Sequence, residues 1–184
     1  MATPSTMVEL GTRAPDFALP DVVTGRTVSL ADLASAKALL VMFLCNHCPY
    51  VVHVRPEIVR LGRDYVARGV AVVAINANSV ASHPQDGPAQ MKELATREAW
   101  PFPFLFDETQ EVARAYDAAC TPDFFLFDAE RRLVYRGQLD DARPNNGKPV
   151  TGKDLRAALD AVLEGRPVSP EQRPSLGCNI KWAS

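Results

Sequence analysis

A C-x-x-C motif between a buried strand and a helix constrains this chain more than any other feature. Residues 38–44 form an apolar run of strand length that leads directly into the motif at Cys45 and Cys48. Apolar residues then recur at near-helical spacing over 51–68. The two cysteines therefore lie at the predicted junction between a strand and a helix.

That position favours an ionised thiol. The first turn of a helix has unpaired backbone N–H groups and a partial positive charge, which stabilise an anion. The motif also contains His47, and an imidazole beside a cysteine lowers the thiol pKa from about 8.5 into a range of roughly 3.5 to 7.5. We therefore expect Cys45 to be a nucleophile with a lowered pKa, tuned by His47.

Composition narrows the class of protein. The 184 residues are enough for one domain, 1–184, and the net charge of -2 argues against a broad nucleic-acid or acidic-membrane surface. We expect a cytoplasmic protein, because the sequence shows neither a leader-like segment nor a membrane-length apolar run. Four cysteines are too few for a disulfide scaffold at this length, so the motif indicates redox chemistry or metal binding.

The order of patterns predicts an α/β fold with a central sheet. An N-terminal hairpin is expected first, then alternating strands and helices, an antiparallel hairpin and a last helix. The corresponding segments are 14–30, 38–44, 51–68, 70–77, 91–95, 102–106, 107–116, 124–127, 133–136 and 155–163. The C-terminal tail, 166–184, has no periodicity and carries Cys178.

Several motifs together resemble a known family. They are Ala14-Pro15-Asp16-Phe17, the Cys45-to-Cys48 motif, Thr121-Pro122 before an aromatic strand, and the ending 177–182. The chain resembles the thioredoxin-like superfamily, and within it the redoxin, peroxiredoxin-like group. The resemblance implies a thioredoxin-like fold, in which helices flank a central mixed β-sheet, with an N-terminal β-hairpin as an extension of the domain.

The resemblance also implies a mechanism and partners. Cys45 would attack a substrate disulfide and Cys48 would resolve the mixed disulfide. Pro122 would be cis and pack against the cysteines, leaving the Thr121 backbone free to pair with an extended substrate. Partners would be protein or small-molecule disulfides and an unidentified electron donor, without a metal or organic cofactor. The cellular role would be antioxidant or in redox homeostasis.

Two other functions remain open. A peroxiredoxin-like thiol peroxidase would use Cys48, but the proline, threonine and arginine that activate peroxide in that family would fall at Val41, Cys45 and Pro122. A non-catalytic thioredoxin-like binding module is the other alternative. It needs neither the C-x-x-C nor the Thr-Pro.

The cysteine pair also admits a structural reading as a zinc site. The remaining ligands would be the other two cysteines, or His47 and His53. Structural zinc sites usually bring a second close-spaced pair, whereas the other cysteines lie far apart in sequence. Redox chemistry is therefore the favoured interpretation.

Two further thiols are candidates for redox chemistry. Cys120 immediately precedes Thr121, although a buried cysteine more often has a packing role. Cys178 can act as a third thiol if the tail folds over the site, or Ile180 and Trp182 can simply dock the tail. We expect oxidised protein to contain some bond to Cys178. The oligomeric state is left open.

Overall fold

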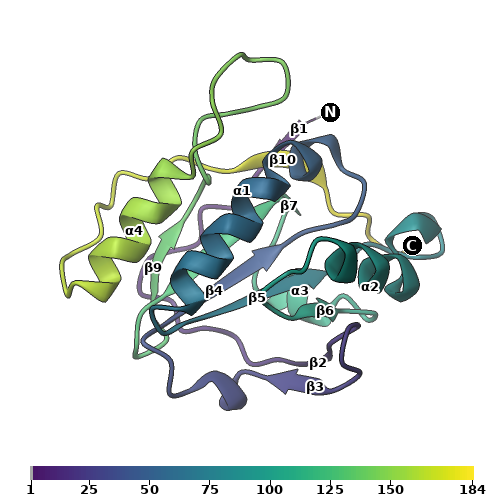
Figure 1. Ribbon diagram of the computed structural model, residues 1–184, viewed down its shortest axis with the longest axis horizontal. Coiled ribbons are helices and arrows are strands. Elements are labelled where there is room, and N and C mark those ends of the chain that lie inside the picture. Colours follow the sequence, from purple (N-terminus) through teal and green to yellow (C-terminus); the bar gives the residue numbers. More distant parts are fainter. Residues whose placement is uncertain (1) are drawn as a thin grey trace.

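The computed structural model describes residues 2–184, and a five-stranded mixed sheet forms its centre (Figure 1). The strand order is β6-β5-β4-β8-β9. β4, β5 and β6 run parallel, whereas β8 and β9 are antiparallel to their neighbours. The strands are β4 (Ala38–Phe43), β5 (Val70–Asn76), β6 (Phe104–Phe106), β8 (Asp123–Phe127) and β9 (Leu133–Arg136). The expected central mixed sheet is confirmed.

Both faces of this sheet are covered, which explains the unbroken apolar runs in the sequence. Every residue of β4 is buried. Because side chains alternate along a strand, Leu40 and Met42 pack into one apolar cluster and Leu39 and Val41 into the other. Strand β4 is thus the centre of two cores.

Three helices cover one face and a mixed layer covers the other (Figure 1). The first face carries α1 (Pro49–Val66), α2 (Pro88–Arg97) and α4 (Lys153–Leu163). The second carries α3 (Glu111–Ala115) and apolar residues of the segment that includes the β2–β3 hairpin. The strands of this hairpin are β2 (Ala18–Pro20) and β3 (Thr27–Ser29). The chain also forms two 3₁₀ turns, η1 (Ala31–Leu33) and η2 (Pro84–Asp86). Flanking helices and the N-terminal hairpin are confirmed.

The C-terminal tail contains a strand that the sequence patterns did not predict. β10 (Leu176–Asn179) is the middle strand of a second sheet, with β1 (Ala2–Pro4) on one side and β7 (Cys120–Thr121) on the other. Figure 1 shows this sheet at the end of the molecule where α1 begins. A four-residue strand is too short for its alternation to stand out in sequence, so the absence of periodicity in the tail did not reveal this strand.

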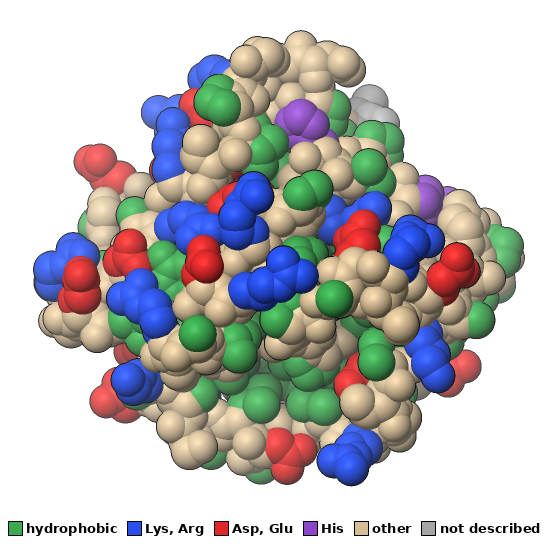
Figure 2. Space-filling model, in the orientation of Figure 1, with side chains coloured by type: hydrophobic (Ala, Val, Ile, Leu, Met, Phe, Trp, Pro, Cys, Tyr) green, Lys and Arg blue, Asp and Glu red, His purple; other side chains and the backbone are tan. Residues whose placement is uncertain are grey.

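The molecular surface mixes charges and carries a half-exposed aromatic residue in the tail. Basic and acidic side chains are interspersed over the face seen in Figure 2. Ile180 is fully buried, whereas Trp182 remains 41% exposed, with the Arg114 guanidinium over its ring. Within residues 2–184, no helix is both long enough and apolar enough to span a membrane.

Gly177 allows β10 to approach β7 closely, and its replacement tests this packing. A Cβ atom at this position would lie 2.0 Å from the Thr121 carbonyl oxygen. We expect Gly177→Ala to destabilise the protein by about 1–3 kcal/mol, because the two backbones must separate. Urea unfolding measures the change, with Asn179→Ala, at an exposed position of the same strand, as the control. Equal stability of the two variants would contradict the close packing.

Candidate active site

The two motif cysteines lie where β4 ends and α1 begins, as the sequence predicts. Cys48 is the N-cap residue of α1, and Pro49 occupies the first helical position, where no N–H is needed. Both cysteines are about 1% exposed and belong to the apolar cluster beneath α1. The site is therefore a pair of sheltered thiols at a helix N-terminus.

Thr121 joins both cysteines to the neighbouring loop. Its hydroxyl oxygen lies 3.3 Å from Cys45 Sγ, and its carbonyl oxygen lies 3.4 Å from Cys48 Sγ. The Thr121–Pro122 peptide bond is cis, which confirms that prediction. The structure therefore brings Thr121 and Pro122 together with the motif cysteines.

The N-cap position of Cys48 and the directions of the pKa shifts favour Cys48 over Cys45 as the ionised thiol. The pKa of Cys48 is lowered to about 5, first by a hydrogen bond from the Cys45 thiol and further by Cys178 and the Val51 backbone N–H. The pKa of Cys45 is raised by the same hydrogen bond to Cys48 and by burial. The directions of the two shifts are thus opposite to the expectation of a lowered pKa at Cys45. Which cysteine attacks a substrate stays a prediction.

The tail strand covers the edge that was expected to receive a substrate. In the β10–β7 pairing, Cys178 is opposite Thr121 and Asn179 is opposite Cys120. The expectation that the Thr121 backbone is free for an extended substrate is therefore wrong. The tail brings Cys178, which is partly exposed, to a position beside Cys48.

His47 is held by an aspartate that the sequence patterns did not single out. Its Nδ1 lies 2.9 Å from Asp86 Oδ2, and the side chain of Asp86 is fully buried. The ring of His83 stacks on the ring of His47, with a distance of 5.7 Å between the two ring centroids. The pairing of His47 with Asp86 fixes the imidazole beside the cysteine motif.

Asp86 organises the loop through hydrogen bonds to several donors. Its carboxylate accepts the Asn46 backbone N–H and the Asn78 side-chain amide, and its backbone carbonyl accepts the Asn76 side-chain amide. These partners come from two separate segments of the chain, the cysteine motif and the end of β5. The one sequence signal was the turn-forming Asp86-Gly87-Pro88, which indicated a loop and nothing of its contacts.

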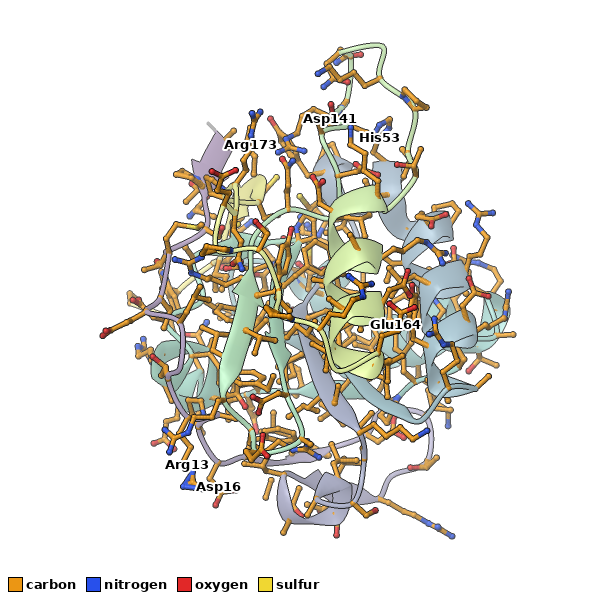
Figure 3. All side chains as sticks on the ribbon, turned by 90° about the vertical axis from the view of Figure 1, so that its left-hand side faces the viewer. Arg13, Asp16, His53, Asp141, Glu164 and Arg173 are labelled. Atoms are coloured by element: carbon orange, nitrogen blue, oxygen red, sulfur yellow. The ribbon has the colours of Figure 1, made fainter. Side chains whose placement is uncertain are left out.

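Cys45, His47 and Asp86 also offer the three donor types of a metal site. Within residues 2–184 they form the group of three whose ligand atoms lie within 4.8 Å of one another. Both Asp86 oxygens already accept N–H donors, so the cluster is built to orient side chains. His53, a ligand in one zinc alternative, is exposed on α1 and does not belong to this group (Figure 3 labels its side chain).

Cys120 is near the site but is enclosed. It is fully buried, and burial raises the pKa of its thiol. Asp123, two positions after Thr121, accepts the Ala119 backbone N–H, which is an ordinary turn contact. Burial raises the pKa of Asp123 to about 7. These features support a packing role for Cys120.

Comparison with known proteins assigns the family. A sequence profile described as Redoxin matches residues 9–155. The chain belongs to the Redoxin family. The Redoxin match includes the motif cysteines and the Thr121-Pro122 segment, and it ends before the tail that carries Cys178.

Three other proteins are similar to this Redoxin chain in sequence or in structure. A conserved protein from Geobacillus kaustophilus, described as uncharacterized, is 58% identical, with a TM-score of 0.98 over 100% of this chain and 97% of that one. A putative thioredoxin from Neisseria meningitidis is 26% identical, with a TM-score of 0.63 over 82% and 89% of the two chains. The fold is therefore thioredoxin-like. The thiol-disulfide oxidoreductase ResA of Geobacillus thermodenitrificans (strain NG80-2) is 29% identical over 71% of this chain and 70% of its own.

Titration of the thiols in this Redoxin chain tests the position of the thiolate. As the pH rises through about 5, the ultraviolet absorbance of the reduced protein should rise because Cys48 ionises. We expect Cys48→Ser to lose this step, Cys120→Ala to keep it, and Cys45→Ala to move it to higher pH, because the hydrogen bond from Cys45 is lost. A first thiol ionisation near pH 8.5 in the reduced protein would contradict the assignment.

Replacing Asp86 tests the network around His47. In Asp86→Asn, an amide group replaces a carboxylate oxygen and faces an N–H donor, so we expect a loss of about 1–3 kcal/mol in the free energy of unfolding. Asp141→Asn is the control, because Asp141 makes a more exposed ion pair with Lys148 and its loss should cost about 1 kcal/mol or less. Urea unfolding measures both. Similar losses in the two variants would show that the Asp86 network stabilises the protein no more than an exposed ion pair does.

Proposed function

We propose that this protein is a thiol-disulfide oxidoreductase whose redox pair is Cys45 and Cys48. Membership of the Redoxin family and the name of the ResA relative support the reaction class. The observation that carries the proposal is the position of both thiols at the N-terminus of α1, where Thr121 contacts Cys45 Sγ at 3.3 Å and Cys48 Sγ at 3.4 Å. Thiols held this close together need little movement to form a disulfide. The pair itself carries the electrons, so the proposal includes neither a metal nor an organic cofactor.

Cys48 is the attacking group in this proposal and Cys45 the resolving one, which reverses the roles expected from sequence. The thiolate is the nucleophile in disulfide exchange, and the pKa of Cys48, about 5, leaves it ionised at neutral pH. Cys48 attacks a sulfur of the disulfide and forms a mixed disulfide, and one substrate thiolate leaves. Cys45 then attacks Cys48 Sγ, closes the Cys45–Cys48 bond and releases the second substrate thiolate. Two protein thiols are thereby oxidised and one substrate disulfide is reduced.

The second step requires that Cys45 lose its proton. Its hydrogen bond to Cys48 is the first cause of its raised pKa, and that cause disappears once Cys48 is in a mixed disulfide. The Cys45–His47–Asp86 cluster places the His47 imidazole nearby, oriented by Asp86. His47 therefore has the position and chemistry of a proton acceptor for Cys45.

Single-turnover exchange tests the proposed function. Reduced protein is mixed with one equivalent of dithiobis(nitrobenzoate), an aromatic disulfide that releases a coloured thiolate, and the products are mapped by mass spectrometry. Wild type should form Cys45–Cys48 and release two coloured thiolates. Cys45→Ser should trap Cys48 in a disulfide with another partner, and Cys48→Ser should leave Cys45 reduced. A Cys48→Ser protein in which Cys45 is oxidised at the wild-type rate would restore Cys45 as the attacking thiol.

A thiol peroxidase is the second candidate, because it would use the same Cys48 thiolate. The groups that activate peroxide in peroxiredoxins are replaced here by Val41, a buried strand residue, by Cys45, and by Pro122, which lacks an N–H. We expect hydrogen peroxide to oxidise the reduced protein no faster than a simple thiolate. A far greater rate constant, followed by protein fluorescence in the same experiment, would make peroxide the main substrate and support the antioxidant role.

A further inference from the structure

The burial of the four cysteines differs in a way that decides how a disulfide enters the site. Cys45, Cys48 and Cys120 are buried, whereas Cys178 is partly exposed. Cys178 lies opposite Thr121 in the β10–β7 pairing and packs against the apolar cluster that contains Cys48. Because the Thr121 carbonyl oxygen lies 3.4 Å from Cys48 Sγ, Cys178 lies beside Cys48, and it lowers the pKa of the Cys48 thiol. The sheltered Cys48 sulfur therefore lies beside a cysteine residue that is partly exposed.

The strand that carries Cys178 is fixed on both sides. Before it, Ser175 exchanges hydrogen bonds with Ser5 and donates its hydroxyl to the Pro122 carbonyl. After it, the buried Ile180 donates its backbone N–H to Ala119. A strand held in this way keeps Cys178 at the thiolate and keeps an extended peptide out of the Thr121 edge.

We propose that Cys178 is the entry thiol of a three-thiol relay, in which it meets the external disulfide and passes it to the buried Cys48–Cys45 pair. This inference rests on the oxidoreductase function proposed above. It replaces the direct attack of Cys48 on the substrate by an attack of Cys178, and it names a substrate class. Small-molecule disulfides fit the relay, because an extended protein segment would have to displace β10 before it paired with Thr121.

The relay consists of three thiol–disulfide exchanges in which atoms and electrons balance. Cys178 loses its proton, attacks the external disulfide and forms a Cys178 mixed disulfide, releasing one substrate thiolate. The Cys48 thiolate then attacks Cys178 Sγ, forms Cys48–Cys178 and releases the second substrate thiolate. Finally Cys45 loses its proton and attacks Cys48 Sγ, giving Cys45–Cys48 and restoring reduced Cys178. The sum equals the reaction proposed above, in which two protein thiols are oxidised and one disulfide is reduced.

The relay predicts a pH profile different from that of direct attack by Cys48. Burial, and then the hydrogen bond to Cys48, raise the pKa of Cys178 to about 11. The charged or titratable groups that act on it include Cys48 at the start of α1 and Cys120 on β7. The positive charges of Lys181 and of the N-terminal amino group oppose the rise in its pKa. The rate should therefore rise by about tenfold per pH unit through the alkaline range below pH 11, since it follows the Cys178 thiolate. Direct attack by Cys48 would instead be independent of pH above about 6.

The test compares three variants with wild type in the dithiobis(nitrobenzoate) reaction. Cys178→Ser should slow oxidation of the Cys45–Cys48 pair by at least about tenfold and abolish the alkaline rise. Cys48→Ser should trap the nitrobenzoate group on Cys178, and Cys45→Ser should accumulate Cys48–Cys178. Cys120→Ala, a buried cysteine one strand away, should match wild type. Circular dichroism and urea unfolding establish that each variant is folded.

The outcomes separate this inference from the function on which it rests. If Cys178→Ser forms Cys45–Cys48 at the wild-type rate and with the wild-type pH profile, the relay is wrong and the oxidoreductase function stands. If Cys178→Ser does not fold, the trapping site in Cys48→Ser decides, and an adduct elsewhere than on Cys178 overturns the relay. If wild type forms no Cys45–Cys48 disulfide, both proposals fall.

Discussion

Contacts to Thr121 tie together the parts of the site. The hydroxyl of this one residue contacts Cys45, its carbonyl oxygen contacts Cys48, and its backbone pairs with Cys178. A single residue thereby brings together three cysteines, two from the motif that leads into α1 and one from the distant C-terminal tail. Any movement of the Thr121–Pro122 segment changes the surroundings of all three sulfurs together.

The sheet beneath the site explains why this residue can be held so firmly. β8, which begins directly after Pro122, lies antiparallel beside β4, so that Asp123 is opposite Phe43 just before the cysteine motif. Both strands are completely buried, with apolar side chains on both faces. A shift of either strand would therefore disrupt both apolar cores. Because the thiols are attached to these strands and to the segments next to them, the rigid sheet holds the thiols in place.

The order and type of the main elements could be predicted because each depends on local patterns. The apolar run at 38–44 and the helical spacing at 51–68 were enough to locate β4, α1 and the cysteines between them. The distribution of charge between Cys45 and Cys48 could not be predicted. It depends on which sulfur receives the hydrogen bonds, and two of those donors come from the tail.

Two other features lay beyond sequence patterns for a similar reason. Asp86 reaches His47 across 39 positions, and its role depends on a loop geometry that a turn signal does not specify. β10 is a strand because β1 and β7 lie on either side of it, since its own four residues carry no clear alternation. In both cases long-range contacts determine what the residues do.

The pairing of β10 with β1 has a consequence for biosynthesis. Ser5 and Ser175, which join these two segments, are 170 positions apart, so the second sheet closes only after nearly the whole described chain has left the ribosome. Until then the motif thiols lack the strand that shelters them and are open to chance oxidation or mispairing. A nascent chain of this protein would therefore benefit from reducing surroundings until its last residues are in place.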